Sequence, residues 1–248
     1  MQKRSSVRQI VCGYPLITSC IVLYVLVALG KFVLRVTRLG GAYDIDSLFW
    51  LNGFMSDFVR RPWCFLTYMW FHNDVLHLAV NMFVLYLASK AFLTHLTKRL
   101  LLYVFVLGGV VGGMLYPLLF GLIHLMGGRS FPLPLLGSSG AVLAVAGTIV
   151  CYVSRGTRFR IGKRAYSLGQ AGLLLAILAF YPILWGNWGG VIVHLGGIIT
   201  GAVCGIVLRR NEQRLLAQEQ ADARSANEDK AKRSGYNALG EEERSKLW

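Results

Sequence analysis

Long uncharged stretches, separated by shorter polar segments, are the main pattern along this chain. A helix that crosses the hydrocarbon core of a bilayer needs about 20 consecutive, mainly apolar residues. The uncharged window 165–208 is long enough for two such helices, and Pro182 with the glycine-rich turn at 186–190 marks the break between them. Four further spans are expected at residues 9–30, 75–96, 100–126 and 138–153. The pattern therefore predicts an all-α, polytopic membrane protein with six transmembrane helices.

Composition supports a membrane protein and distinguishes an apolar membrane domain from a charged C-terminal tail. Only 15% of the 248 residues are charged and 55% are hydrophobic, whereas a soluble domain carries about 25% charge. Most of the 12 acidic residues follow residue 207, and none lies between residues 75 and 211. We therefore expect a membrane domain at 1–208 and a charged cytoplasmic C-terminal tail at 209–248. The membrane domain has a long first loop at about 38–71, whose aromatic residues suit the membrane interface.

The formal net charge of +14 raises the question of nucleic-acid binding. No basic patch with interleaved aromatic residues is present in the sequence, so nucleic acid is not an expected partner. Basic residues gather instead at span ends on one side, at 3–8, 98–99, 155–164 and 209–210, with those at 31–38 as the exception. The positive-inside rule then places both termini in the cytoplasm.

The five cysteines lie mostly inside apolar runs, are odd in number and show no metal-binding spacing. They are better explained as small buried apolar residues than as a disulfide framework. The sequence therefore predicts no metal site, and it implies no cofactor.

Polar side chains at membrane depth are costly and are usually functional. Two histidines open the second expected span, and an asparagine lies one helical turn beyond the second of them, on the same face. Two adjacent serines open the fourth span, and a further histidine lies in the first turns of the sixth. These residues are His72, His77, Asn81, Ser138, Ser139 and His194. We expect them to converge, because all lie near the outer ends of their helices.

Each of these residues also has a purely structural explanation. The serines of a Gly-Ser-Ser-Gly segment are more often a helix N-cap than a nucleophile. A single histidine near a helix end is more often interfacial, which is the role we expect for His95 and His124 and an alternative for His194. The polar residues of the second span could form a helix–helix contact. Metal ligation is disfavoured there, because histidines five residues apart point to different faces of a helix.

Glycines recur every four residues after His194, at 197, 201 and 205. Such spacing favours close packing of two helices. The fourth span, with Gly140, Ala144 and Gly147, is the suitable partner. That contact would bring His194 up to the two serines.

Together these motifs resemble the signature of the rhomboid intramembrane serine proteases. The matching segments are His72-x-x-x-x-His77-x-x-x-Asn81, Gly137-Ser138-Ser139-Gly140 and His194-x-x-Gly197-x-x-x-Gly201. They lie in the family's order and on the expected helices, and the resemblance covers roughly residues 9–208. It implies a rhomboid-like helical bundle.

The resemblance also implies a role for each residue. Ser139 is the implied nucleophile and His194 the implied general base, while His77, Asn81 and the Ser139 backbone N–H would line the oxyanion hole. Site-shaping roles fall to His72, Gly137, Gly140, Gly197 and Gly201. The chemistry agrees, because a serine hydroxyl needs a base and a developing oxyanion needs donors already in place. Without a carboxylate, the site would be a Ser-His dyad.

Two positions depart from the family pattern. Where the family has a Trp-Arg pair in the first loop, this chain reads Arg61-Pro62-Trp63-Cys64, which puts the internal bonding of that loop in doubt. The family often has an aromatic side chain four residues past the nucleophile, where it packs on the catalytic histidine. This chain has Leu143 there, so weaker support for His194 is expected.

The implied activity is hydrolysis of a peptide bond in or next to the transmembrane segment of another protein. The resemblance implies a small residue before the cleaved bond and a helix-destabilising segment after it. The expected partners are transmembrane protein substrates and the lipid bilayer. The expected location is a bacterial cytoplasmic (inner) membrane, with the site opening to the outer side.

Two other functions remain open. A catalytically inactive rhomboid-like protein would bind membrane-protein clients without cutting them, although such relatives lose the serine or the histidine that this chain keeps. A small-molecule transporter is disfavoured, because the expected spans contain no carboxylate for proton coupling.

Overall fold

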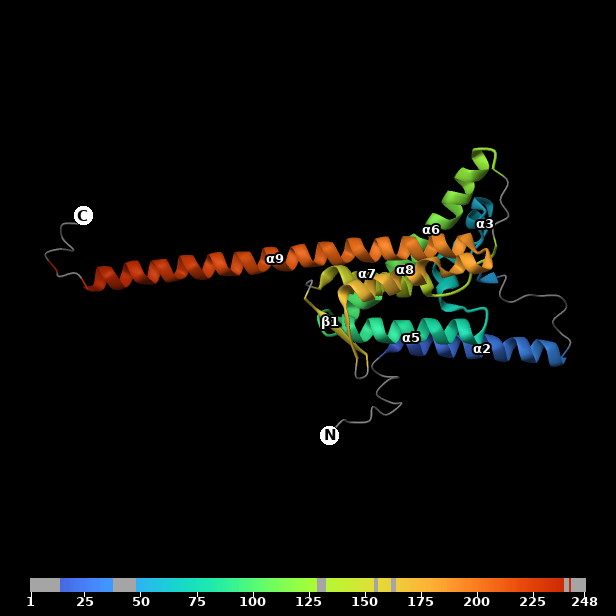
Figure 1. Cartoon of the computed structure of the whole chain (residues 1–248), viewed down its shortest axis with the longest axis horizontal. Helices are drawn as coiled ribbons and strands as arrows, with labels where there is room; N and C mark the ends of the chain where they lie inside the picture. The colour runs from blue at the N-terminus through green and yellow to red at the C-terminus, as the bar shows by residue number, and fades with distance from the viewer. Residues whose placement is uncertain are drawn as a thin grey trace, which may run out of the picture. The chain divides into compact units, whose positions relative to one another are not determined.

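The computed structural model of the chain describes residues 14–37, 48–128, 133–153, 156–161, 164–238 and 241. Its long helices are α2 (Pro15–Thr37), α5 (Val75–Phe92), α6 (Lys98–Leu125), α7 (Ser139–Tyr152), α8 (Leu168–Phe180) and α9 (Trp188–Ala238), shown in Figure 1. The shorter elements are α3 (Met55–Arg60), α4 (Cys64–Thr67), η2 (Tyr68–Trp70), η3 (Tyr181–Trp185) and the strands β1 (Arg158–Ile161) and β2 (Arg164–Ser167). The chain divides into two compact units, residues 1–206 and 207–248. The predicted all-α bundle is confirmed.

Five of the described helical segments are long and apolar enough to cross a bilayer. The remaining predicted span corresponds to α7, which is apolar but has only 14 residues. At 1.5 Å per residue, α7 is about 21 Å long, against a hydrocarbon core of about 30 Å. If one end of α7 reached one membrane surface, its other end would therefore lie inside the hydrocarbon layer.

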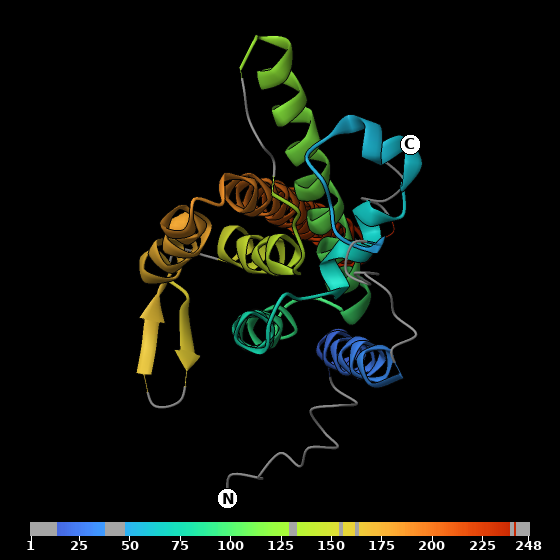
Figure 2. The same cartoon turned by 90° about the vertical axis from the view of Figure 1, so that its right-hand side faces the viewer.

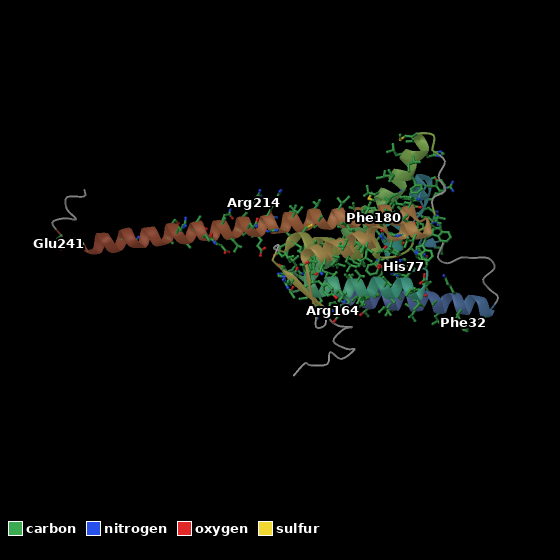
Figure 3. The ribbon with its side chains drawn as sticks, in the orientation of Figure 1. Phe32, His77, Arg164, Phe180, Arg214 and Glu241 are labelled. Carbon is green, nitrogen blue, oxygen red and sulfur yellow. The ribbon has the colours of Figure 1, made fainter. Side chains whose placement is uncertain are left out.

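The long helices carry large apolar side chains on exposed faces. Phe32 on α2 and Leu173 on α8 are each 63% exposed, and Figure 3 shows Phe32 pointing outward. Such surfaces would favour aggregation in water, but they are ordinary in contact with lipid. They agree with an integral, multi-pass membrane protein.

Helix α7 forms the centre of the first unit. Its residues from Gly140 to Ile149 are all buried. Figure 2 shows α5, α6, α8 and the first part of α9 arranged around it. A helix enclosed in this way has few positions that can tolerate a change of side-chain volume.

The contact between α7 and α9 depends on glycines. At three positions on α9, an added Cβ atom would collide with a backbone carbonyl oxygen of α7. The pairs are Gly197 with Gly140, Gly201 with Ala144, and Gly205 with Thr148. The predicted packing of these glycines against the fourth span is confirmed. The two backbones approach this closely only because no side chain separates them.

Helix α6 joins the same contact through its own glycines. A Cβ atom at Gly112 would lie 2.7 Å from the Val193 carbonyl oxygen, and one at Gly196 would lie 2.8 Å from Gly112 Cα. A Cβ atom at Gly108 would meet Ala144. Three helices therefore meet with almost no side chains between them.

The connection between α7 and α8 differs from the prediction. A helix was expected from residue 165, but residues up to Ser167 form the antiparallel β1–β2 hairpin, and α8 begins at Leu168. Ser167 caps α8, because its hydroxyl accepts from the Gln170 N–H while the Gln170 side chain accepts from the Ser167 N–H. This capping box fixes the end of the strand and the start of the helix at the same residue. Figure 3 shows Arg164 of the hairpin and His77 toward opposite ends of the first unit.

Two other helices also have boundaries that differ from the predicted ones or cannot be compared with them fully. Helix α9 begins at Trp188, within the predicted turn, after Gly186 with a left-handed φ of 66°. It continues to Ala238, well beyond the predicted end of the span at 208, because residues rich in Ala, Glu, Gln and Arg are good helix formers. Helix α2 runs from Pro15 to Thr37, and the predicted start of the first span at residue 9 lies outside the described residues.

The described part of the first loop is tied to the segment that precedes α7. Leu51 and Leu135 exchange two backbone hydrogen bonds of 2.9 Å, and the Tyr68 carbonyl accepts from the Gly137 N–H at 3.0 Å. In place of bonding by the family's Trp-Arg pair, Trp63 Nε1 and Cys64 Sγ both donate to the Leu48 carbonyl. The predicted interfacial position of this loop remains a prediction, and residues 38–47 lie outside the described residues.

The α7–α9 contact generates a prediction about stability. Gly201→Ala should destabilise the fold by about 1–3 kcal/mol, because the new methyl group would overlap the Ala144 carbonyl. Gly172→Ala on α8 is the matched control, since a Cβ atom there meets nothing within 4 Å. It should be neutral or slightly stabilising, because Ala is the better helix former. Thermal unfolding in detergent, followed by circular dichroism, measures both. Equal midpoints for the two variants would contradict the close contact.

Candidate active site

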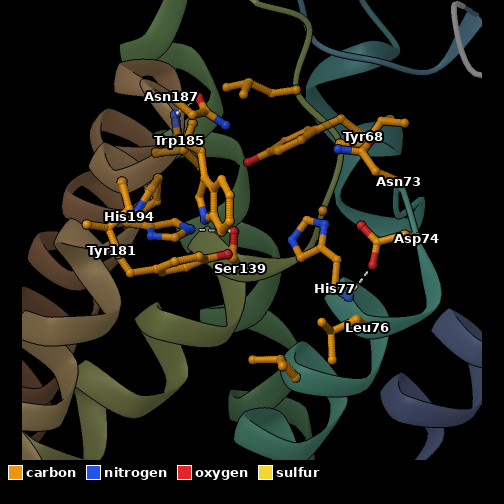
Figure 4. A pocket seen from close by; sticks show the side chains of 18 residues that line it. Tyr68, Asn73, Asp74, Leu76, His77, Ser139, Tyr181, Trp185, Asn187 and His194 are labelled. Atoms are coloured by element: carbon orange, nitrogen blue, oxygen red, sulfur yellow. Dashed lines mark hydrogen bonds between the residues drawn. The ribbon is translucent and has the colours of Figure 1, made fainter.

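A cavity of about 610 Å³ lies between the first turns of α5, α7 and α9, with η3 on one side. It brings together four of the predicted site residues, Ser139, His194, His77 and Gly137, the first three of which are labelled in Figure 4. The rest of its lining is largely apolar and aromatic. Neither His95 nor His124 lines the cavity, and the interfacial roles expected for them remain predictions.

Ser139 and His194 are in direct contact. Ser139 is the first residue of α7, and its Oγ lies 2.7 Å from Nε2 of His194, two turns into α9. The other ring nitrogen, Nδ1, lies 2.9 Å from the Leu178 carbonyl oxygen on α8. A carbonyl can only accept, so Nδ1 carries the hydrogen and Nε2 is left to accept the hydroxyl proton. The pair is therefore arranged for proton transfer from serine to histidine.

An aromatic side chain supports the His194 ring. Tyr181 of η3 packs against it, with ring centroids 5.9 Å apart and planes inclined by 33°. Weaker support for His194 was expected because Leu143 stands where the family often has an aromatic residue. In this structure an aromatic contact with the His194 ring comes from another element, while Leu143 is buried within α7. Leu178 and Tyr181 were both missed by sequence analysis. Leu178 acts through its backbone, which no side-chain pattern reveals, and the only signal for Tyr181 was an aromatic residue next to Pro182.

The two adjacent serines have different partners. Ser138 Oγ lies 3.1 Å from His72 Nε2, and both residues are buried, at 0% and 5% exposure. Neither lines the cavity. Ser138 occupies the N-cap position of α7, but its side chain makes no capping hydrogen bond. Of the two Ser-His pairs, only Ser139 with His194 can meet a molecule that enters the cavity.

His77 and Asn81 occupy one face of α5 but differ in their access to the cavity. Figure 4 shows the His77 ring on the wall opposite Ser139 and His194. Asp74 caps the helix by accepting from the His77 N–H at 2.7 Å. Asn81 is buried and does not line the cavity, and its Nδ2 donates to the His77 carbonyl at 3.0 Å. The structure therefore brings His77 to the cavity, whereas Asn81 lies behind it.

Gly137 allows the chain to pass close to His77. Its φ of +133° is a backbone conformation that favours glycine. A Cβ atom at this position would lie 2.7 Å from His77 Cε1 and 3.0 Å from His77 Nε2. A side chain here would push the His77 ring out of place.

His72 is held in the neutral form. Burial lowers the pKa of His72 to about 3, and the neighbouring His77 adds to the effect, while Asp74 acts in the opposite direction. A neutral imidazole ring has one hydrogen-bond donor and one acceptor. Either can pair with a hydroxyl, because a hydroxyl can both donate and accept a hydrogen bond. His72 therefore makes its contact with Ser138 without a buried charge.

Comparison with known proteins agrees with the motifs. Residues 59–211 match the family model of the rhomboid domain. Rhomboid-related protein 3 of Homo sapiens is 29% identical over 210 residues, which cover 79% of this chain and 47% of that protein. The chain thus spans about half the length of this curated relative. The range matched by the family model contains all of His72, His77, Asn81, Ser138, Ser139 and His194.

The contrast between the two serines generates a prediction. A fluorophosphonate should label the wild-type protein and Ser138→Ala, but not Ser139→Ala, because only the Ser139 hydroxyl faces the cavity with a base beside it. The measurement is in-gel detection of a fluorescent probe on protein purified in detergent. Labelling that survives in Ser139→Ala and disappears in Ser138→Ala would refute this assignment.

Proposed function

The chain belongs to the rhomboid family, and we propose that it is a serine endopeptidase that cleaves transmembrane proteins in or next to their membrane-spanning segments. The observation that carries the proposal is the 2.7 Å contact between Ser139 Oγ and His194 Nε2 at the wall of a cavity. A protein that only bound clients would not need a serine activated in this way.

The proposed reaction begins at Ser139. As Oγ attacks the carbonyl carbon of the scissile bond, His194 Nε2 takes the hydroxyl proton. The imidazolium that forms keeps its Nδ1–H directed at the Leu178 carbonyl, so its orientation is maintained. His194 then gives the proton to the leaving amine as the C–N bond breaks, and an acyl-enzyme remains on Ser139. Water hydrolyses this ester by the same route, with His194 again acting as the base.

The carbonyl oxygen becomes negatively charged when Oγ attacks, and it needs hydrogen-bond donors. We assign this role to His77 and the Ser139 backbone N–H. Asn81, which was expected to share it, donates to the His77 carbonyl and would contribute directly only if its amide turned toward the cavity. Support for His77 comes from its place on the cavity wall opposite the dyad. Ser139 is the first residue of α7, where backbone N–H groups have no partner within the helix. Preplaced donors of this kind contribute strongly to catalysis in a site shielded from water.

The proposed substrate is a membrane-spanning segment that can unwind. Every carbonyl within a transmembrane helix is already hydrogen-bonded and enclosed by its own backbone. A scissile carbonyl can reach Ser139 only if the helix opens locally, so a helix-destabilising sequence after the cleaved bond would help. The apolar lining, with Val80, Leu135, Leu136 and Leu184, suits such a segment. The preference for a small residue before the bond is carried over from the family.

The proposed location is a bacterial cytoplasmic (inner) membrane, with both termini cytoplasmic and the cavity opening outward. Support comes from the basic residues at the starts of α6 and of the hairpin, Lys98, Arg99 and Arg158. Figure 1 shows the hairpin toward the end of the first unit where α5 ends and α6 begins. Positive charge gathered at one end is typical of the cytoplasmic side.

The experiment that tests the activity uses the purified 248-residue chain with a single-span model substrate in detergent and in liposomes. Wild-type protein should release two fragments, whereas Ser139→Ala should release none above background, because the covalent route is lost. Mass spectrometry of the fragments would locate the cleaved bond relative to the span. Tight binding without fragments from the wild type would indicate the inactive, client-binding alternative instead.

The geometry also predicts that two residues one turn apart on α5, His77 and Asn81, contribute unequally to the rate of the reaction. His77→Ala should lower the single-turnover rate by about 10²–10³-fold, the usual cost of losing an oxyanion donor. Asn81→Ala should cost less, because its side chain lies behind His77 and donates to the His77 carbonyl. Both variants should still react with a fluorophosphonate, since Ser139 and His194 remain paired. An equal loss in the two variants would show that the Asn81 amide turns into the cavity during the reaction.

A further inference from the structure

The residue just before the proposed nucleophile has a defined partner that the proposed reaction does not use. Ser138 is fully buried, and its hydroxyl is within hydrogen-bond distance of His72 Nε2. The Ser138 backbone N–H also points at the same nitrogen, at 3.5 Å. One side of the His72 ring is therefore held by the segment that leads into α7.

His72 in turn contacts His77. The two rings meet edge to face, with centroids 5.3 Å apart and planes inclined by 72°. On the side of Gly137, the absence of a side chain leaves room for the His77 ring and little more. The position of the His77 ring is therefore limited by His72 and by Gly137.

We infer that Ser138 is a positioning residue: its hydroxyl fixes His72, and His72 fixes the ring of His77 opposite Ser139. This inference rests on the proposed function, in which His77 stabilises the oxyanion. It explains why a fully buried serine lies beside the reactive one without capping the helix. It also accounts for the placement of His72 outside the cavity, in contact with a residue that lines it.

The first test separates positioning from general loosening of the fold. Ser138→Ala should lower kcat by about 10- to 10²-fold at nearly unchanged KM, the scale of a small misplacement of a catalytic group. Thr148→Val is the matched control, because Thr148 is also fully buried in α7 and its hydroxyl bonds only within the helix, to the Ala144 carbonyl. The control should retain wild-type kcat. An unchanged kcat in Ser138→Ala, or an equal loss in the control, would overturn the inference.

The second test asks whether Ser138 acts through His77. In a His77→Ala background, the further change Ser138→Ala should alter kcat by less than about twofold, because the ring that it positions is gone. A full additional loss in that background would overturn the inference. The double variant Ser138→Ala with His72→Phe removes both polar side chains, so neither is left buried without the other. The Ser138 backbone N–H loses only a long contact of 3.5 Å, so the double variant should fold even if Ser138→Ala alone does not. It should show the same loss of kcat.

The third test does not depend on cleavage. In protein labelled at the histidine rings, the NMR resonance of His77 should shift in Ser138→Ala and stay in place in Thr148→Val. If the wild type cleaves no substrate but the resonance shifts in this way, the proposed protease activity fails while the positioning contact stands. If the wild type cleaves and the His77 resonance is the same in all three proteins, the positioning inference fails alone.

Discussion

The direct backbone contact between α7 and α9 is the constraint on which the rest of the structure depends. Carbonyl oxygens of α7 lie where side chains on α9 would otherwise be, and glycines at 197, 201 and 205 make this possible. His194 lies one turn before the first of these glycines, and Ser139 directly precedes Gly140 on the facing helix. The same contact that packs the two helices therefore sets the distance between hydroxyl and imidazole. Lipid supplies no hydrophobic force between helices, so close packing has to supply the attraction.

The site solves the problem of orienting a histidine without burying a charge. In the familiar serine proteases a buried carboxylate holds the imidazole. Within a bilayer such a carboxylate would have to be desolvated, at a cost of several kcal/mol. Here the Leu178 carbonyl accepts from Nδ1 and Tyr181 packs on the ring, and both groups are neutral. A backbone carbonyl is a weaker acceptor than a carboxylate, but it adds no desolvation penalty of its own.

The sequence was sufficient for the parts of this arrangement that depend on side-chain type and spacing. The helices, the glycine contact and the set of polar residues all follow from local pattern. The hairpin was missed because its strands are four residues each and continue into an apolar helix, which hides their period. The Leu178 contact could not be predicted, since any residue offers a carbonyl. The different surroundings of Ser138 and Ser139 depend on a helix start defined to a single residue, and pattern does not locate helix ends so finely.

The shortness of α7 links the fold to the chemistry. Helix α7 has only 14 residues and is too short to cross the hydrocarbon core, and Ser139 is its first residue. The segment that precedes α7 is held in place by the first loop. Leu135 exchanges two backbone hydrogen bonds with Leu51, and the Gly137 N–H donates to the Tyr68 carbonyl. The proposed hydrolysis would need water in the cavity, and the polar groups of the wall, among them His77 and Ser139, offer it hydrogen bonds that the surrounding apolar side chains do not. A longer α7 would carry the serine toward the surface, where water is abundant but a membrane-embedded substrate is not. Under the proposed function, the position of the helix start would therefore be a compromise between access for the substrate and access for water.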